Sequence, residues 1–203
     1  MKTKLSKKRA ISTVLTTVII LVASVVLGSG VVLYGTSLFQ GSTQTESISV
    51  SGVKVWVNTD AGGIDGLAWG AAAIRNTGDK IVSVDKIQIR GTDIPFNQWY
   101  ADTDVIPSLF QQSLNHTGWS GGGLAETGAC AGGERINIDN GQGDICGGVL
   151  AGPMSLEPGQ SAILYFQLSN GTLTSLDSGV NTGVNIYAGK AGAPQSVTVQ
   201  GKS

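Results

Sequence analysis

The hydrophobic and polar positions divide this chain into two parts with different periods. No charged residue occurs between Arg9 and Glu46, and apolar residues dominate the stretch from Val14 to Tyr34 without leaving a polar face. An apolar run of this length predicts a helix that could span a bilayer, which requires about 20 residues. From Gly41 onward, short segments of alternating apolar and polar residues predict β-strands instead.

The second part of the chain predicts about seven short strands. Valines alternate with Lys54 and Trp56 in the run 53–57, so we expect the valines on one face of a strand and Trp56 on the other. Turn signals rich in Asn, Gly and Pro, such as 76–79 and 157–159, separate the strands. Further strands are predicted at 67–74, 81–90, 161–168, 184–188 and 196–200. The pattern therefore predicts an α+β chain, in which a long N-terminal apolar α-helix precedes an antiparallel β-sandwich.

The segment from Tyr100 to Ala151 departs from this alternation. It contains several glycine runs and both cysteines of the chain, Cys130 and Cys146. Two thiols and a single histidine cannot form the usual structural zinc site, so we predict a disulfide, which implies an oxidising compartment. Closing a loop of this size would stabilise the fold by about 3 kcal/mol in the chain-entropy model. We interpret the segment as a surface excursion that this disulfide pins in place.

Charge is distributed unevenly along the sequence. Five of the 13 Lys and Arg residues lie in the first nine positions, so the rest of the chain carries 8 basic residues against 14 acidic ones. This acidic remainder argues against a nucleic-acid partner, because phosphate binding requires clustered Lys and Arg. The low charge and the many small polar residues are typical of secreted β proteins. Basic residues before the apolar run predict that this end stays in the cytoplasm and the rest lies outside.

Three fates are open to the N-terminal apolar segment. It could be a secretory signal removed near Gly28, a permanent single-pass anchor, or a helix that stays on the mature protein after the basic leader is cut off. The apolar run is longer than a signal core of about 7–15 residues, which favours the third fate. Small residues along the run also favour it, because they let helices approach one another closely. The predicted helix-packing positions are Ala23, Ser24, Gly28, Gly30 and Gly35.

The run 7–14, Lys-Lys-Arg-Ala-Ile-Ser-Thr-Val, resembles the processing site of archaeal type IV pilin-like proteins, a family that includes adhesion pilins and archaellins. The resemblance implies a class III signal peptide, which a prepilin-type peptidase would cut between Arg9 and Ala10. Bacterial type IV pilins carry Glu at the fifth mature position, where this chain has Val14, so the sequence is closer to the archaeal branch. The turns at 75–79 and 156–160 are similar to turns in the immunoglobulin-like outer domains of this family.

The resemblance implies a cleaved basic leader at 1–9, a hydrophobic filament-core helix at 10–40, and an extracellular immunoglobulin-like β-sandwich at 41–203 with its insertion at about 100–151. Family members are inserted in the membrane before assembly, and a membrane platform adds them to a homopolymer through the N-terminal helix. We therefore expect a non-enzymatic structural subunit of an extracellular archaeal type IV pilus-like filament. The start of the predicted mature chain resembles adhesion pilins more than Gly-rich archaellins, so adhesion is favoured over an archaellum that drives motility.

Two other function classes stay open. One is a single-pass, membrane-anchored protein whose β domain binds a ligand on its tryptophans, although tryptophans in such domains more often belong to the core or to an interface. The other is an ectoenzyme. Its candidate base, the lone His116, has no Ser or Cys partner nearby, so we interpret it as an exposed loop residue and predict no catalytic residue and no cofactor.

The remaining motifs predict surface modification rather than metal chemistry. Asn115 and Asn170 each begin an N-glycosylation sequon. The runs 58–62 and 139–144 place oxygen ligands among glycines, as calcium loops do, but neither ends in the glutamate that completes such a loop. We interpret both runs as ordinary turns and predict no metal site.

Overall fold

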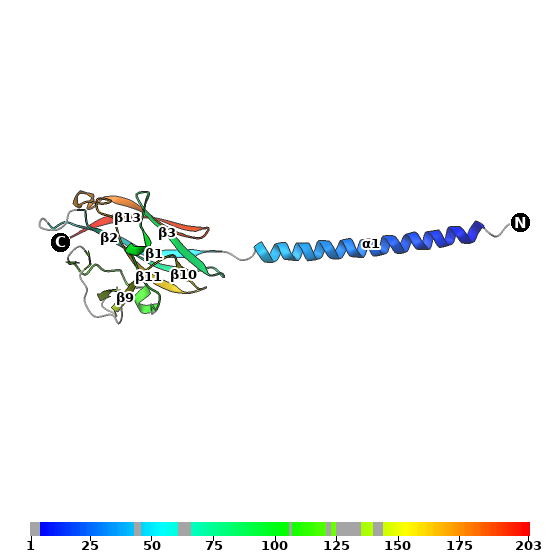
Figure 1. Cartoon of the computed structure of the whole chain (residues 1–203), viewed down its shortest axis with the longest axis horizontal. Helices are drawn as coiled ribbons and strands as arrows, with labels where there is room; N and C mark the ends of the chain where they lie inside the picture. Colours follow the sequence, from blue (N-terminus) through cyan, green and yellow to red (C-terminus); the bar gives the residue numbers. More distant parts are fainter. Residues whose placement is uncertain are drawn as a thin grey trace. The chain divides into compact units, whose positions relative to one another are not determined.

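The computed structural model describes residues 5–42, 46–60, 66–105, 107–120, 123–124, 135–139 and 144–203. These residues belong to two units, Met1–Gln44 and Thr45–Ser203 (Figure 1). The first unit is helical and the second is mostly β-structure. The coarse prediction of an apolar N-terminal helix followed by a β domain is therefore confirmed.

The N-terminal unit is built on the helix α1 (Leu5–Ser42), which extends beyond the predicted range 10–40 at both ends. The sequence of α1 contains no proline, the residue that most strongly interrupts a helix. Hydroxyl groups in α1 bond to the carbonyl of the preceding turn, as Ser24 Oγ does to the oxygen of Ile20 at 2.7 Å. The stretch Ser12–Leu38 is long and apolar enough to cross a membrane, with a mean hydropathy of 2.4.

The β-rich unit contains a curled sheet with the strand order β10-β3-β12-β13-β1-β2-β11-β5-β9-β8, and β4 pairs with β3. The strands are β1 (Ile48–Asn58), β2 (Ala68–Asn76), β3 (Val82–Ile89), β4 (Thr92–Asp93), β5 (Trp99–Asp102), β8 (Arg135–Asp139), β9 (Asp144–Val149), β10 (Met154–Leu156), β11 (Ser161–Gln167), β12 (Asn181–Ala188) and β13 (Ala191–Lys202). The strands β6 (Trp119–Ser120) and β7 (Gly123–Leu124) form a separate pair. Within the described part of this unit, three short helices connect strands: η1 (Phe96–Gln98), α2 (Pro107–Phe110) and η2 (Ser175–Asp177). Every predicted strand range overlaps an observed strand.

The two halves of β13 pair with different neighbours, and this pairing links the two groups of strands. Residues 191–198 run antiparallel to β12, whereas residues 199–202 run parallel to β1. A first core therefore combines Ile87 and Ile186, from the neighbouring strands β3 and β12, with Leu164 from β11, which lies far from them in the strand order. All three are fully buried. The strand order and this shared core together describe a sheet that curls around one apolar interior.

The alternation predicted for β1 is confirmed. Val55 and Val57 belong to the first core, whereas Trp56 belongs to a second core on the opposite face of the sheet. The second core also contains Trp69 from β2 and Tyr165 from β11. Because successive side chains of a strand point to opposite faces, β2, β11 and the end of β1 from Val55 to Asn58 are buried on both sides.

The prediction that 100–151 is a surface excursion is wrong for much of its described part. This segment provides the sheet strands β5, β9 and β8, and the isoleucines at 136, 138 and 145 lie buried in the second core. Isoleucine alternates with polar Asn137 in β8, which is a strand signal. The signal is short and lies among glycine runs, which explains why the sequence pattern alone did not identify it.

Candidate functional site

The surface of α1 is the first candidate site because it is apolar on every side. The large apolar side chains of α1 range in exposed fraction from 53% at Val18 to 72% at Val31. Soluble proteins rarely expose contiguous apolar patches larger than a few hundred Å². Full burial of a side chain of this kind contributes about 1.5–3 kcal/mol. A helix with this surface is therefore stable in lipid or against other apolar helices, but not in water alone.

The predicted packing residues form two columns along α1. With 3.6 residues per turn, Ser24, Gly28 and Gly35 share one side of the helix, and Ala23 and Gly30 share another. A Cβ added at any of the three glycines would meet no atom within 4 Å. Val31 also lies in the first column, between Gly28 and Gly35. A second helix could approach closely at the small residues of each column.

The predicted cleavage site lies in the first turns of α1, since the backbone of Arg9 and Ala10 is helical. Residues 1–4 of the predicted leader lie outside the described residues. The leader and the apolar stretch therefore form one continuous helix from Leu5 onward in this chain.

The structure corrects the interpretation of His116 as an exposed loop residue. The side chain of His116 is only 3% exposed, and its ring lies against the rings of Trp56 and Trp119 at centroid distances of 5.3 Å and 4.3 Å. Desolvation on burial and, to a smaller extent, the positive charge of Lys202 together lower the pKa of His116 from 6.5 to about 4. The sequence offered no signal for this burial, because the rings that cover His116 come partly from a distant strand.

Both predicted glycosylation residues lie on the surface. Asn115 is exposed although its neighbours Leu114 and His116 are buried, and its Oδ1 accepts the N–H of His116 at 2.9 Å. Asn170 is exposed in the turn after β11. In both asparagines the side chain is accessible from solvent, as attachment of a glycan requires.

The predicted disulfide and metal loops are described in part. Cys146 lies on β9 and is not a free thiol, whereas Cys130 lies outside the described residues, so the pairing of the two stays a prediction. In the run 58–62, Asn58 Oδ1 accepts the N–H of Asp60 at 2.9 Å, which is the hydrogen bond of an ordinary Asx turn. Residues 61, 62 and 140–143 of the two runs lie outside the described residues. Across the described part of the chain, no group of three His, Cys, Asp or Glu residues is arranged to hold a metal ion.

The tryptophans belong mainly to the cores, as the more frequent role of such residues predicted. Trp56, Trp69 and Trp99 are at most 4% exposed, and the Nε1–H of Trp99 donates to the oxygen of Ile94 at 3.0 Å. Trp119 is half-buried, and its Nε1–H donates to the oxygen of Lys202 at 2.7 Å. Three of the four side chains are thus too buried to form an open platform for a ligand.

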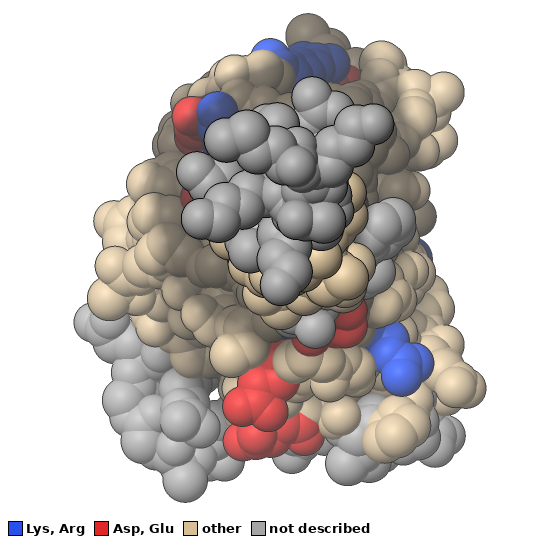
Figure 2. All heavy atoms as spheres, turned by 90° about the vertical axis from the view of Figure 1, so that its right-hand side faces the viewer, with Lys and Arg blue, Asp and Glu red and all other residues tan. Residues whose placement is uncertain are grey.

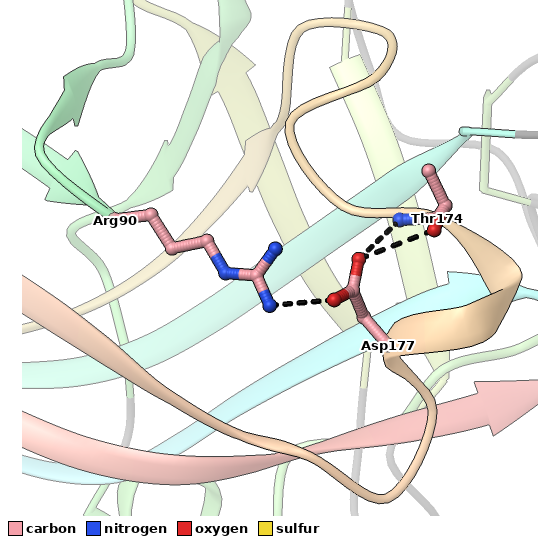
Figure 3. A network of polar contacts seen from close by, with 3 residues as sticks. All are labelled: Arg90, Thr174 and Asp177. Atoms are coloured by element: carbon pink, nitrogen blue, oxygen red, sulfur yellow. Dashed lines mark hydrogen bonds and ion pairs between the residues drawn. The ribbon is translucent and has the colours of Figure 1, made fainter.

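A polar network that the sequence analysis did not single out joins the turn after β3 to the helix η2 (Figure 3). Arg90 has a positive φ of 52°, and its Nη2 lies 2.5 Å from Asp177 Oδ1. The other oxygen of Asp177 accepts the N–H of Thr174 at 2.8 Å, which forms a capping box at the start of η2. The Arg90 hydrogen bond and this backbone bond lower the pKa of Asp177. The Thr-x-x-Asp spacing is the sequence signal that could have revealed the capping box.

The outer surface carries few charges. Figure 2 shows one face on which uncharged residues make up most of the described surface and charged side chains occur in small groups. The salt bridges found among the described residues are Lys86–Asp93 and Arg90–Asp177. In comparisons with known proteins, no family model and no curated protein matches this chain.

Proposed function

We propose that this chain is a structural subunit of an extracellular archaeal type IV pilus-like filament. In this proposal α1 polymerises in the filament core, and the β-rich unit forms the outer layer as an immunoglobulin-like sandwich. The observation that carries the proposal is the surface of α1, which is apolar on all sides and has no charged residue from Ala10 to Ser42. No catalytic role is proposed for any residue.

Contact between copies of α1 explains its residue types better than contact with lipid alone. About a dozen large aliphatic side chains would together gain on the order of tens of kcal/mol on burial, before the cost of ordering. Lipid would provide this gain for any apolar helix. The two columns of small residues, however, serve close helix–helix approach, and they lie on two sides of α1, so that each copy can contact neighbours on both.

The run 7–14 supports a specific route to the assembled state. A prepilin-type peptidase would remove residues 1–9 from the membrane-inserted precursor, and an assembly platform would then move the helix from lipid into the filament. We assign an adhesive role in preference to motility because the residues that follow the proposed cleavage site resemble adhesion pilins more than Gly-rich archaellins. The sparse charge of the outer surface and the predicted disulfide between Cys130 and Cys146 are in keeping with an extracellular location.

The first experiment identifies the mature N-terminus. Cells that produce the chain are sheared, the high-molecular-weight surface material is collected, and the start of this protein is determined by mass spectrometry. The proposal expects a start at Ala10 in that material. A protein that keeps Met1 and stays with the membranes would contradict the filament proposal and favour a membrane-anchored protein. A start near Val31 would mean that the chain is a secreted domain without a filament helix.

The second experiment tests the packing of α1 with Gly28→Leu. Leucine favours the helix more than glycine does by roughly 0.6–1 kcal/mol, and its Cβ meets no atom of the chain within 4 Å. Any loss of filaments must therefore arise between molecules. We expect Gly28→Leu to abolish filaments while the β-rich unit still folds. The matched control, Val22→Leu, changes an already bulky position that lies away from both columns, and it should assemble normally. Normal assembly of Gly28→Leu would contradict the proposed packing.

A further inference from the structure

The segment 114–119, which we call the His116 segment, covers one face of the sheet in the β-rich unit. Leu114 and His116 point into the second core, where they are 1% and 3% exposed. The segment lies against three strands, because His116 contacts Trp56 of β1, Asn115 is bonded to Tyr165 of β11, and Trp119 is bonded to Lys202 of β13. It therefore closes a layer over strands that are distant from it in the sequence.

The site is arranged for a neutral imidazole ring. Nδ1 of His116 accepts the N–H of Gly118 at 3.1 Å, so the single proton of the neutral ring is on Nε2. Nε2 is buried and has no hydrogen-bond partner in the described structure. A second proton would have to enter at Nδ1, where it would replace the bond from Gly118 and place a positive charge in a buried site.

The side chains described around the ring offer no negative charge to compensate a positive one, and the backbone hydrogen bond of His116 itself favours the protonated form less than burial and Lys202 oppose it. Among the described residues around His116, the charged group is Lys202 on β13, whose positive charge opposes protonation. The titratable group on β11 is Tyr165, which burial keeps in its neutral form. The contact on β1 is the uncharged Trp56, and Lys54 of the same strand donates a hydrogen bond to Ser113, just before the segment. The two charged groups shown next to the segment on the described strands, Lys54 and Lys202, are both positive.

Two hydrogen bonds hold the segment to the sheet, and a third holds Ser113, the residue just before it. The hydroxyl of Tyr165 donates to the oxygen of Asn115 at 2.9 Å, and Nε1–H of Trp119 donates to the oxygen of Lys202 at 2.7 Å. Nζ of Lys54 donates to Oγ of Ser113 at 2.5 Å. If the segment moves so that the ring of His116 reaches water, it loses these bonds together, so closure is coupled to the charge of one side chain.

We propose that His116 makes the segment 114–119 an acid-released latch on the β-rich unit. Protonation of His116 favours the state in which the ring is hydrated, and the segment then leaves Trp56, Tyr165 and the end of β13 exposed. The rest of the sheet stays folded, because the first core contains no histidine and does not include the segment. This inference is independent of the filament proposal, since it concerns the β-rich unit alone.

The test follows amide hydrogen exchange in the full-length chain in detergent micelles between pH 7 and pH 3.5. Exchange is corrected for its intrinsic dependence on pH. The amides of 114–119 should lose at least tenfold in protection as the pH falls from about 6.5 to about 4, the interval between the pKa of the hydrated ring and that of the buried ring. The amides of β3 and β12 should not lose protection in this interval. Fluorescence of Trp119 provides a second signal, because its ring lies 4.3 Å from the imidazole that gains the charge.

Variants decide whether His116 is responsible. His116→Gln cannot take up a proton but can still accept the bond from Gly118, so its segment should stay closed at pH 3.5. His116→Phe provides a second neutral variant if the glutamine variant folds poorly. Lys202→Met removes the opposing charge and brings the pKa of the buried ring closer to that of the hydrated ring, so less protection should be lost in acid. Asp93→Asn, on β4, which pairs with β3 and not with the strands under the segment, should leave the loss unchanged. The proposal is overturned if the wild-type segment stays protected at pH 3.5, or if the neutral variants open at the same pH as the wild type.

Discussion

The side-chain amide of Asn76 donates a hydrogen bond to the carbonyl oxygen of Leu156 at 2.9 Å, joining two turns that lie 80 residues apart. The same Nδ2 donates to the oxygen of Lys80 at 2.6 Å, and Oδ1 accepts the N–H of Gly78 at 2.9 Å. The backbone strengthens the connection, because the N–H of Gly159 donates to the oxygen of Asn76 at 3.0 Å. Asn76 is fully buried, so it holds the ends of β2, β10 and β11 together from inside the fold.

Replacement of Asn76 by Ala should destabilise the β-rich unit by about 2–3 kcal/mol, because it leaves the buried carbonyl of Leu156 without its donor. Urea unfolding monitored by tryptophan fluorescence measures this change in the free energy of unfolding. The control is Asn181→Ala, because Asn181 is exposed and bonds to Thr198 at the surface. We expect the control to lose less than about 0.5 kcal/mol. Equal losses in the two variants would contradict the role assigned to Asn76.

The two turns joined by Asn76 were predictable from the sequence, but their contact was not. Asn-Thr-Gly-Asp at 76–79 and Glu-Pro-Gly at 157–159 are turn signals that can be recognised within a short stretch of sequence. The hydrogen bond between them depends on the strand order, which brings β10 next to β3 and β11 next to β2. The side of a strand on which a residue lies is a local property, whereas its partner across the fold depends on the whole topology.

The same distinction explains what could be predicted of the candidate sites. The apolar surface of α1 and its small-residue columns follow from sequence spacing alone, because a helix repeats every 3.6 residues. The burial of His116 did not follow, since its neighbours in the sequence are Asn115 and Thr117, and polar neighbours predict a surface loop. Trp56, from a strand about 60 residues earlier, covers the ring.

Gly70 allows the ring of Phe166 to lie flat across the sheet. The two residues are directly paired between β2 and β11, and a Cβ at Gly70 would lie 2.5 Å from Cζ of Phe166. Phe166 is fully buried and cannot move away without disturbing the first core. We therefore expect Gly70→Ala to destabilise the unit by about 1–3 kcal/mol in urea unfolding.

The matched control for that variant is Gly148→Ala in β9, where an added Cβ would meet no atom within 4 Å. Because alanine loses less conformational freedom on folding than glycine, this control should be neutral or slightly more stable than the wild type. A Gly70→Ala variant as stable as the Gly148→Ala variant would show that the sheet accommodates the extra methyl group.

The ion pair between Arg90 and Asp177 should contribute about 0.5–1 kcal/mol in a double-mutant cycle with alanine, since both side chains are partly exposed. The more exposed pair Lys86–Asp93, with its nitrogen and oxygen 3.4 Å apart, should give a smaller coupling energy and serves as the control. Arg90 also has a positive φ, so Arg90→Gly should be more stable than Arg90→Ala by up to about 1 kcal/mol. A coupling energy near zero for Arg90–Asp177 would show that the ion pair does not stabilise the fold and that the backbone hydrogen bonds of the turn hold this region.

This pair also predicts the sign of a pH effect. The pKa of Asp177 is lower in the folded chain than in the unfolded chain, so its contribution is fully present above the ordinary pKa of an aspartate. That contribution is lost as the pH falls through the lowered value. In Asp177→Asn this part of the acid dependence should be absent, as measured by urea unfolding at pH 5 and at pH 3. An unchanged acid dependence in the variant would mean that other groups account for it.

Tyr165 predicts a loss of stability at the alkaline end. Burial raises the pKa of the Tyr165 hydroxyl above its ordinary value of 10.0, and the hydroxyl donates to the oxygen of Asn115. The folded chain therefore holds a proton that the unfolded chain releases above pH 10, so stability falls as the pH rises beyond 10. At pH 11 the loss should be about 1.4 kcal/mol relative to pH 9.

Tyr165→Phe should abolish this alkaline loss, although its stability at pH 9 is lower by about 1 kcal/mol because the hydrogen bond to Asn115 is missing. Tyr187→Phe, at a half-buried position on β12, should still lose stability at alkaline pH. If the alkaline loss is absent in Tyr187→Phe, then Tyr187 and not Tyr165 accounts for it.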